Sequence, residues 1–167
     1  DAMEKSFDVI TDVFSEFGKL VGKEYDFFEG YQLEDAEEVI VALNSSCGTT
    51  KDVIDELRAK GKKVGLLKVR VFRPFNFKLI VEKLKHAKTI AVLDRSASFG
   101  GFGGPVFTEI RSSFHESDAK PNIINYIYGL GGRELDLELV HKVFNEIKEI
   151  SETGELGIQV RCLGVRQ

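Results

Sequence analysis

Short apolar runs alternate with amphipathic segments over most of the chain. The runs are rich in β-branched residues, as buried strands are, and span 38–44, 63–72, 89–94 and 122–127. Between and after them, apolar residues recur every three to four positions, which predicts helices over 52–60, 77–85, 104–114 and 137–150. Strands that alternate with helices imply crossover connections. We therefore expect an α/β fold with three α/β/α layers and a mostly parallel sheet of four core strands.

The first 22 residues predict a further amphipathic helix. Apolar residues recur there at alternating steps of four and three: Met3, Phe7, Ile10, Phe14, Phe17 and Val21. Either this stripe packs on the domain's own core, or it docks on another subunit or a part of the protein outside this chain. The predicted organisation is an N-terminal helix with an acidic connector (1–37), an α/β domain (38–155), and an edge strand or separately packed tail (156–167).

Composition narrows the class of protein. The chain has 167 residues, and none of its apolar runs approaches the length of a membrane span. Its two cysteines, Cys47 and Cys162, are too few and too far apart for a disulfide framework, so we expect a cytoplasmic protein. The chain begins with Asp1, and its single methionine is Met3, which suggests a piece of a longer protein.

Charge is distributed unevenly along the chain. The formal net charge is −4, which argues against a nucleic-acid-binding protein. Residues 1–38 hold twelve acids and three bases, whereas residues 51–88 hold twelve bases and four acids. We expect the basic block to face the acidic N-terminal part or a partner, and we prefer docking between domains as the explanation.

The segments that follow predicted strands are the candidate sites, because ligands bind at the carboxyl ends of strands in open α/β sheets. In the small-residue turn 45–50, the candidate contact residues are Ser45, Ser46, Cys47 and Thr49. The turn precedes a predicted helix, whose free N–H groups suit a phosphate or carboxylate, and Thr49 with Asp52 resembles a helix cap. A capped turn without a ligand is the alternative, and the sequence of a P-loop is absent.

The glycine-rich loop 94–105 is the most unusual segment. Its four glycines permit close approach of another surface, but they do not match the spacing of a dinucleotide-binding fingerprint. We interpret this loop as an interface or a ligand-covering segment, with Arg95, Ser96 and Phe102 as contact candidates. Arg95 either binds an anion or pairs with Asp94.

A second glycine-rich turn follows the fourth predicted strand and ends at Arg133. This arginine is either an anion or subunit contact or a solvated turn residue. Histidines and cysteines show no spacing typical of a metal site, and no serine nucleophile motif occurs. The residues alone therefore indicate no catalytic residues.

Several motifs, in order along nearly the whole chain, resemble the alpha subunit of pyruvate:ferredoxin oxidoreductases. They include LEDAEEVIV (33–41), CGTTKDVIDELR (47–58), KVGLLKVRVFRPF (63–75), AVLDRSASFG (91–100), YGLGGR (128–133) and LGVRQ (163–167). The resemblance implies the subunit's second domain, which is like the C-terminal domain of transketolase. The family departs from this chain just before 45–50, where it commonly has Gly-Ser and this chain has Asn44-Ser45.

The same resemblance implies a function for the complete enzyme. Such enzymes decarboxylate a 2-oxoacid, typically pyruvate, on thiamine diphosphate with Mg, pass electrons through 4Fe–4S clusters to ferredoxin, and transfer the acyl group to coenzyme A. The residues that hold these groups lie in other domains and subunits, so this domain is expected to bind no cofactor or metal itself. Its implied role is to assemble with the remaining alpha-subunit domain and the other subunits, without nucleic acid or membrane.

Two alternatives stay open at this stage. The first is a free-standing small-anion or nucleotide-binding module that uses the segment 45–50. The second is a redox-sensing domain built on Cys47, because a cysteine at a helix N-terminus can have a lowered pKa.

Overall fold

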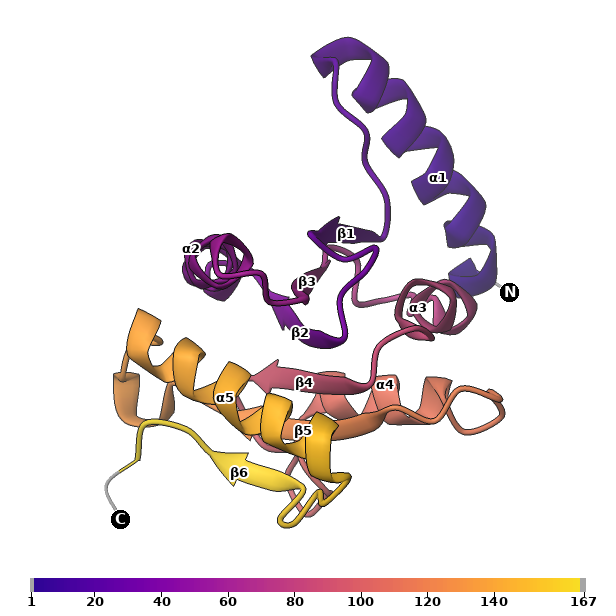
Figure 1. Ribbon diagram of the computed structural model, residues 1–167. Helices are drawn as coiled ribbons and strands as arrows, with labels where there is room; N and C mark the ends of the chain where they lie inside the picture. The colour runs from indigo at the N-terminus through magenta and orange to yellow at the C-terminus, as the bar shows by residue number, and fades with distance from the viewer. Residues whose placement is uncertain (1, 166–167) are drawn as a thin grey trace.

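A six-stranded sheet forms the middle of the computed structural model, which describes residues 2–165 (Figure 1). The strand order is β1-β3-β2-β4-β5-β6. The antiparallel neighbours are β1 and β3, and all other neighbours are parallel. The strands are β1 Phe28–Tyr31, β2 Glu38–Leu43, β3 Val64–Val69, β4 Thr89–Asp94, β5 Asn122–Ile127 and β6 Val160–Cys162. The prediction of an α/β fold with a mostly parallel sheet is confirmed.

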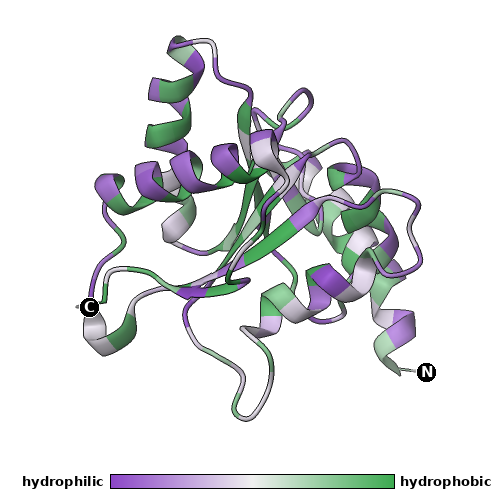
Figure 2. Ribbon diagram, turned by 60° about the horizontal axis from the view of Figure 1, so that its bottom comes forward, coloured by the Kyte–Doolittle hydropathy of each residue, from purple (hydrophilic) through white to green (hydrophobic). Residues whose placement is uncertain are grey.

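Helices cover both faces of the sheet. One face packs against α2 (Ser46–Ala59) and α5 (Leu137–Thr153), and the other against α3 (Phe77–Leu84) and α4 (Pro105–Ser113). A short 3-10 turn, η1 (Leu130–Gly132), follows β5. In Figure 2 the central strands are coloured mainly as hydrophobic, whereas the helices carry both colours. Strands buried on both faces need continuous apolar runs, which is why those runs marked the strands in the sequence.

Two strands extend the sheet beyond the four that we predicted. The first, β1, lies within the predicted acidic connector, where no strand was expected. It is only four residues long, and its pairing partner β3 lies far along the sequence, so local periodicity gave little sign of it. The second, β6, covers three residues of the C-terminal segment and pairs with β5 as an edge strand. Residues 166–167 of that segment lie outside the described residues.

Most predicted elements agree with the structure to within a few residues, and β4 and β5 agree completely. The side chain of Asn76 accepts a hydrogen bond from the Leu79 N–H and caps α3, as the sequence suggested. The predicted strand over 63–72 was too long, because β3 ends at Val69. The predicted start of the second helix at residue 52 was wrong by six residues, because α2 begins at Ser46.

The N-terminal helix α1 (Ala2–Val21) has the predicted extent but packs only loosely. Phe7 and Ile10 contact the core on the α3 and α4 side, whereas none of the residues described in α1 is buried. Figure 1 shows the rest of this helix projecting away from the sheet. Of the two interpretations of its apolar stripe, packing on the domain's own core therefore accounts for only part of it. None of the helices within residues 2–165 is long and apolar enough to cross a membrane.

Candidate functional site at the carboxyl edge of the sheet

The sheet separates between β2 and β4 at its carboxyl edge. The ladder between these two strands ends at the pair Val41–Val92. By contrast, β2 stays paired with β3 as far as Leu43–Val69, and β4 stays paired with β5 as far as Asp94–Ile127. Here the order of the strands reverses, and such switch points are where α/β sheets bind ligands. The two main candidate segments, 45–50 after β2 and 95–105 after β4, both begin here.

Residues 46–50 form the first part of α2, and only Ser45 of the predicted turn precedes the helix. The Ser46 hydroxyl donates to the Leu43 carbonyl, and the Thr50 hydroxyl donates to the Ser46 carbonyl, so both hydroxyls are used within the chain. The N–H groups of Cys47 and Gly48 donate to Asn44 and Ser45 carbonyls. These two hydroxyls and two N–H groups are therefore not available to an anion.

The predicted cap formed by Thr49 and Asp52 is wrong, because both residues lie inside α2. The helix begins after Ser45, whose side chain makes no capping hydrogen bond, and Ser45 is exposed beside Asn44. Asn44 has a positive φ of 56°, which is uncommon for a residue other than glycine. The chain turns sharply here so that α2 starts directly from the strand end.

Cys47 is buried and points into the core between the sheet and α2 and α5. Burial raises the pKa of its thiol, since the thiolate would lose its hydration, while Lys68 and Lys51 act in the opposite direction. A raised pKa and an inaccessible sulfur are the reverse of what a reactive cysteine requires. The redox-sensing alternative therefore has no physical support in this structure.

A buried hydrogen-bond network fixes both ends of the glycine-rich loop. The Asp94 carboxylate accepts from the backbone N–H groups of Val106 and Phe107, at 3.0 Å each, and so caps α4. The Asn125 side chain donates to Asp94 and to the Val92 carbonyl, and it accepts from the Gly104 N–H at 2.8 Å. Asp94 and Asn125 are both buried, so their hydrogen-bonding groups depend on one another rather than on water.

This network settles the role of Asp94. Its carboxylate oxygens are occupied by N–H donors from α4 and β5, so they are used to hold the loop rather than to pair with Arg95. Burial raises the pKa of Asp94, while the hydrogen bonds from Val106, Phe107 and Asn125 act to lower it. The buried carboxyl group therefore depends on these three donors in place of water.

The loop between these fixed ends is compact and exposes two aromatic rings. The Ser98 N–H donates to the Gly103 carbonyl at 2.8 Å, and the Gly101 N–H donates to Ser98, so the loop closes on itself. The Phe99 side chain is fully exposed at the tip, and Phe102 is 58% exposed. Exposed phenylalanines on a preformed loop are typical of protein contact surfaces.

Phe102 also forms one wall of a hollow beside α4. Its ring lies 6.1 Å from that of Phe107, and the Arg111 guanidinium lies 5.5 Å from the Phe102 ring centre. The hollow has a volume of about 560 Å³, and Thr108 and His115 also line it. The exposed ring therefore stands beside a cationic and hydroxyl-rich surface.

The remaining candidates, Arg95, Ser96 and Arg133, are all exposed. The Arg95 side chain lies against Gly129, which follows β5. Arg133 donates a hydrogen bond to the Gly164 carbonyl, so it ties down the C-terminal segment within this chain. The structure thus brings Arg95 and Ser96 to the carboxyl edge and gives Arg133 an intrachain partner. Their predicted contacts with a ligand or partner stay predictions.

The uneven charge distribution is explained largely within the chain. Six ion pairs join acids of 26–37 to bases of 51–88: Asp26–Lys83, Glu29–Lys51, Glu29–Arg70, Asp35–Arg58, Glu37–Lys63 and Glu37–Lys88. The Lys51 ammonium lowers the pKa of Glu29, with Arg70 contributing. The basic block therefore faces the acidic segment around β1, which was one of the two expected arrangements.

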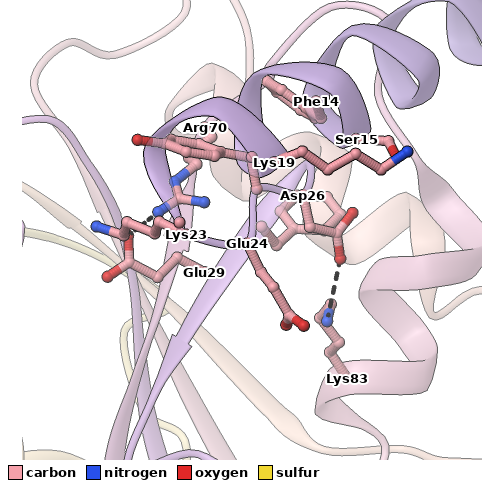
Figure 3. Close-up of a pocket in the computed structure, with 13 residues that line it drawn as sticks. Phe14, Ser15, Lys19, Lys23, Glu24, Asp26, Glu29, Arg70 and Lys83 are labelled. Atoms are coloured by element: carbon pink, nitrogen blue, oxygen red, sulfur yellow. Dashed lines mark hydrogen bonds and ion pairs between the residues drawn. The ribbon is translucent and has the colours of Figure 1, made fainter.

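A larger hollow of about 790 Å³ lies between α1 and the edge of the sheet (Figure 3). Lys19, Lys23 and Glu24 project from α1 and the segment after it, while Glu29 and Arg70 line the opposite side. Arg70 pairs with Glu29 and also lies over the Tyr25 ring. Because acids and bases line this hollow together, it has no marked preference for one charge.

A 4Fe–4S cluster does not fit this chain's own residues. Within residues 2–165, no group of three or more His, Cys, Asp or Glu side chains is arranged to hold a metal ion. Two cysteines, one buried and one exposed, cannot supply the four thiolates of a 4Fe–4S cluster.

Sequence reasoning missed the residues that organise the site. Asn125 was treated as an ordinary strand residue, and Asp94 was considered only as a partner of Arg95. A polar Asn and Asp inside apolar strands are nevertheless a usable signal of a buried network. Phe99 was not singled out among the loop residues. Its place at the tip depends on the hydrogen bonds that close the loop.

Solved structures show the same fold. A chain of split gene transketolase matches with a TM-score of 0.56 and 15% identity, over 79% of this chain and 44% of that one. The 2-oxoglutarate:ferredoxin oxidoreductase from Magnetococcus marinus matches with a TM-score of 0.56 and 23% identity, over 78% of this chain and 21% of that one. At these identities the likeness establishes the fold, which is like that of transketolase's C-terminal domain.

The relatives found by sequence identify the family, which the solved structures do not. The chain is 40% identical over 154 residues to pyruvate synthase subunit PorA of Methanosarcina barkeri, which covers 92% of this chain and 38% of that protein. It is 42% identical over 146 residues to PorA of Thermotoga maritima, which covers 87% of this chain and 37% of that protein. It is 39% identical over 160 residues to ketoisovalerate oxidoreductase subunit VorA of Pyrococcus abyssi, which covers 95% of this chain and 40% of that protein. The chain thus spans about two fifths of these relatives.

A family model matches the region that holds the site. The model describes the pyruvate:ferredoxin oxidoreductase core domain II and matches residues 36–140, from β2 to the start of α5. This range includes the network of Asp94 and Asn125 and the loop between 95 and 104. The chain belongs to the family of pyruvate:ferredoxin oxidoreductase core domain II.

Proposed function

We propose that this chain is the assembly domain of the alpha subunit of a 2-oxoacid:ferredoxin oxidoreductase. The complete enzyme converts a 2-oxoacid anion, coenzyme A and two oxidised ferredoxins into an acyl-CoA, CO2, two reduced ferredoxins and one proton. Pyruvate is the preferred substrate in this proposal and 2-oxoisovalerate the alternative, because the relatives include both PorA and VorA subunits. Thiamine diphosphate with Mg and the 4Fe–4S clusters are assigned to the rest of the enzyme.

The observation that carries this role is the hydrogen-bonded loop 95–104, with Phe99 fully exposed at its tip. Loops that present an aromatic ring in a fixed conformation lose little entropy on binding. The network of Asp94 and Asn125 sets that conformation while contributing no chemistry of its own. A surface organised in this way supports a role in subunit contact, close to the carboxyl edge of the sheet.

The test uses the full-length subunit with its partner subunits. Replacing both rings, Phe99→Ala with Phe102→Ala, is expected to weaken assembly at least tenfold while leaving the thermal stability of the subunit unchanged. Ile158→Ala is the matched control, since Ile158 is 75% exposed and lies outside the loop, just before the edge strand β6. If the double variant assembled like the native subunit, the loop would have no role in assembly.

Activity and ligand binding provide the second test. The complete complex is expected to reduce ferredoxin when given pyruvate and coenzyme A, and the 167-residue chain is expected to be inactive. Calorimetry of the chain with thiamine diphosphate, coenzyme A, phosphate and nucleotides is expected to show no binding. Tight binding of any of these would favour the anion-binding module instead. The structure argues against that module, because the hydroxyls of Ser46 and Thr50 already donate to backbone carbonyls.

A further inference from the structure

The helix α1 carries a second apolar stripe that the domain leaves uncovered. Val9, Val13 and Leu20, here called the outer stripe, are 60%, 55% and 83% exposed. Their spacing of four and seven residues places them in one line along the helix. The outer stripe lies next to the apolar stripe that the sequence predicted for this helix. Two residues of that predicted stripe, Phe7 and Ile10, pack on the core. The apolar face of α1 is therefore wider than the surface that the domain offers to it.

The C-terminal half of α1 stands away from the sheet. The Phe14 ring stacks on Tyr25 and the Phe17 ring is tilted against it. Tyr25 belongs to the segment that returns from α1 to the sheet. The hollow shown in Figure 3 separates this half of the helix from β1 and α3. A helix of about 20 residues with little packing is only marginally stable in water. Burying Val9, Val13 and Leu20 against a further surface would therefore stabilise the helix.

We propose that the outer stripe docks on an apolar surface, rimmed with basic residues, in the part of the longer polypeptide outside this chain. The PorA subunit of Pyrococcus abyssi aligns with all of this chain, yet the alignment covers only 42% of that subunit. Such a subunit holds a counterpart of α1 and a larger remainder in one polypeptide. Covalent linkage gives that remainder a high effective concentration next to α1.

Charge favours a basic rim and disfavours a second copy as the partner. Asp12 and Glu16 lie beside the outer stripe, and α1 as a whole has four acids and two lysines. Two such helices packed on each other would bring like charges within a Debye length. A basic rim on the opposing surface would instead pair with these carboxylates. The inference rests on family membership and not on the proposed role of the loop 95–104.

Site-specific labelling of the full-length subunit tests the proposal. Single variants Val13→Cys and Leu20→Cys are made in a Cys162→Ser background, with Thr11→Cys on the opposite, exposed face of α1 as the matched control. Labelling by a maleimide is followed at each site by mass spectrometry. The two outer-stripe thiols are expected to react at least tenfold more slowly than the control in the native subunit and equally fast after denaturation.

Three outcomes would overturn the proposal. Equal native rates at all three positions would show that the outer stripe is uncovered. Protection that grows with subunit concentration would identify a second copy as the occupant. Protection only in the complex with other subunits would identify one of those subunits. Loss of assembly on removing Phe99 and Phe102, with the labelling pattern intact, would support the loop's role independently of this one.

Discussion

The Asn125 side-chain nitrogen lies 3.0 Å from a carboxylate oxygen of Asp94 and links the interior of β5 to the end of β4. Through the same carboxylate, both strands are tied to the first N–H groups of α4. The glycine-rich loop therefore begins and ends on one buried network. This arrangement explains how a loop with four glycines presents Phe99 in a defined place.

Removing the Asn125 side chain should destabilise the domain. In Asn125→Ala, the Gly104 N–H loses its acceptor and Asp94 loses a donor, and buried groups without partners are costly. We expect the free energy of unfolding to fall by about 2–3 kcal/mol, measured by urea denaturation. Asn122→Ala, on the same strand but only partly buried, is the control and should cost less than about 1 kcal/mol. An equal fall in the free energy of unfolding in both variants would show that the buried network does not stabilise the domain.

Two glycine substitutions should have opposite effects. A Cβ atom at Gly104 would collide with the Asp94 side chain, so Gly104→Ala is expected to destabilise the domain by more than about 2 kcal/mol. A Cβ atom at Gly48, inside α2, would meet open space. Gly48→Ala is therefore expected to raise the melting temperature, with a gain of about 0.5–1 kcal/mol from helix propensity. Thermal unfolding followed by circular dichroism measures both, and a loss in Gly48→Ala would refute this account.

The ion pairs of Glu29 predict a pH-dependent stability. Because Lys51 and Arg70 lower the pKa of Glu29 in the folded state, its contribution is present above the unfolded value near 4.5. That contribution is lost as the pH falls through the lowered, folded-state pKa. Glu29→Gln should cost about 1 kcal/mol at pH 7, and the difference from the native chain should shrink at acidic pH. Urea denaturation at several pH values measures it, and a difference independent of pH would contradict the ion pairing.

The two cysteines should differ sharply in reactivity. Cys162 is exposed, whereas Cys47 is buried and burial raises the pKa of its thiol. A disulfide reagent such as dithionitrobenzoate is therefore expected to modify one thiol per native chain quickly and the second only after unfolding. Cys162→Ser is the control and should abolish the fast phase. A fast phase that persisted in that variant would show that Cys47 is accessible.

Local sequence pattern determined the order and type of most elements. The limits of β4 and β5 follow from apolar runs, and those of α3 from its cap at Asn76, because these signals lie within a few residues of each other. The motifs along the chain also indicated the family. Longer-range features were harder to predict: β1 forms only because β3 lies beside it, and α2 begins at Ser46 because the hydroxyl there bonds to the strand end.

The sequence by itself determined the class of fold, the separation of acidic and basic segments, and the family of the domain. The tertiary structure decided which groups meet: Glu29 with Arg70, Asp94 with Asn125, and Cys47 with the core rather than with solvent. Asp94 and Asn125 are 31 residues apart, so their contact depends on the pairing of β4 with β5. Burial and exposure are properties of the packed chain, which is why Phe99 and the outer stripe of α1 emerged only there.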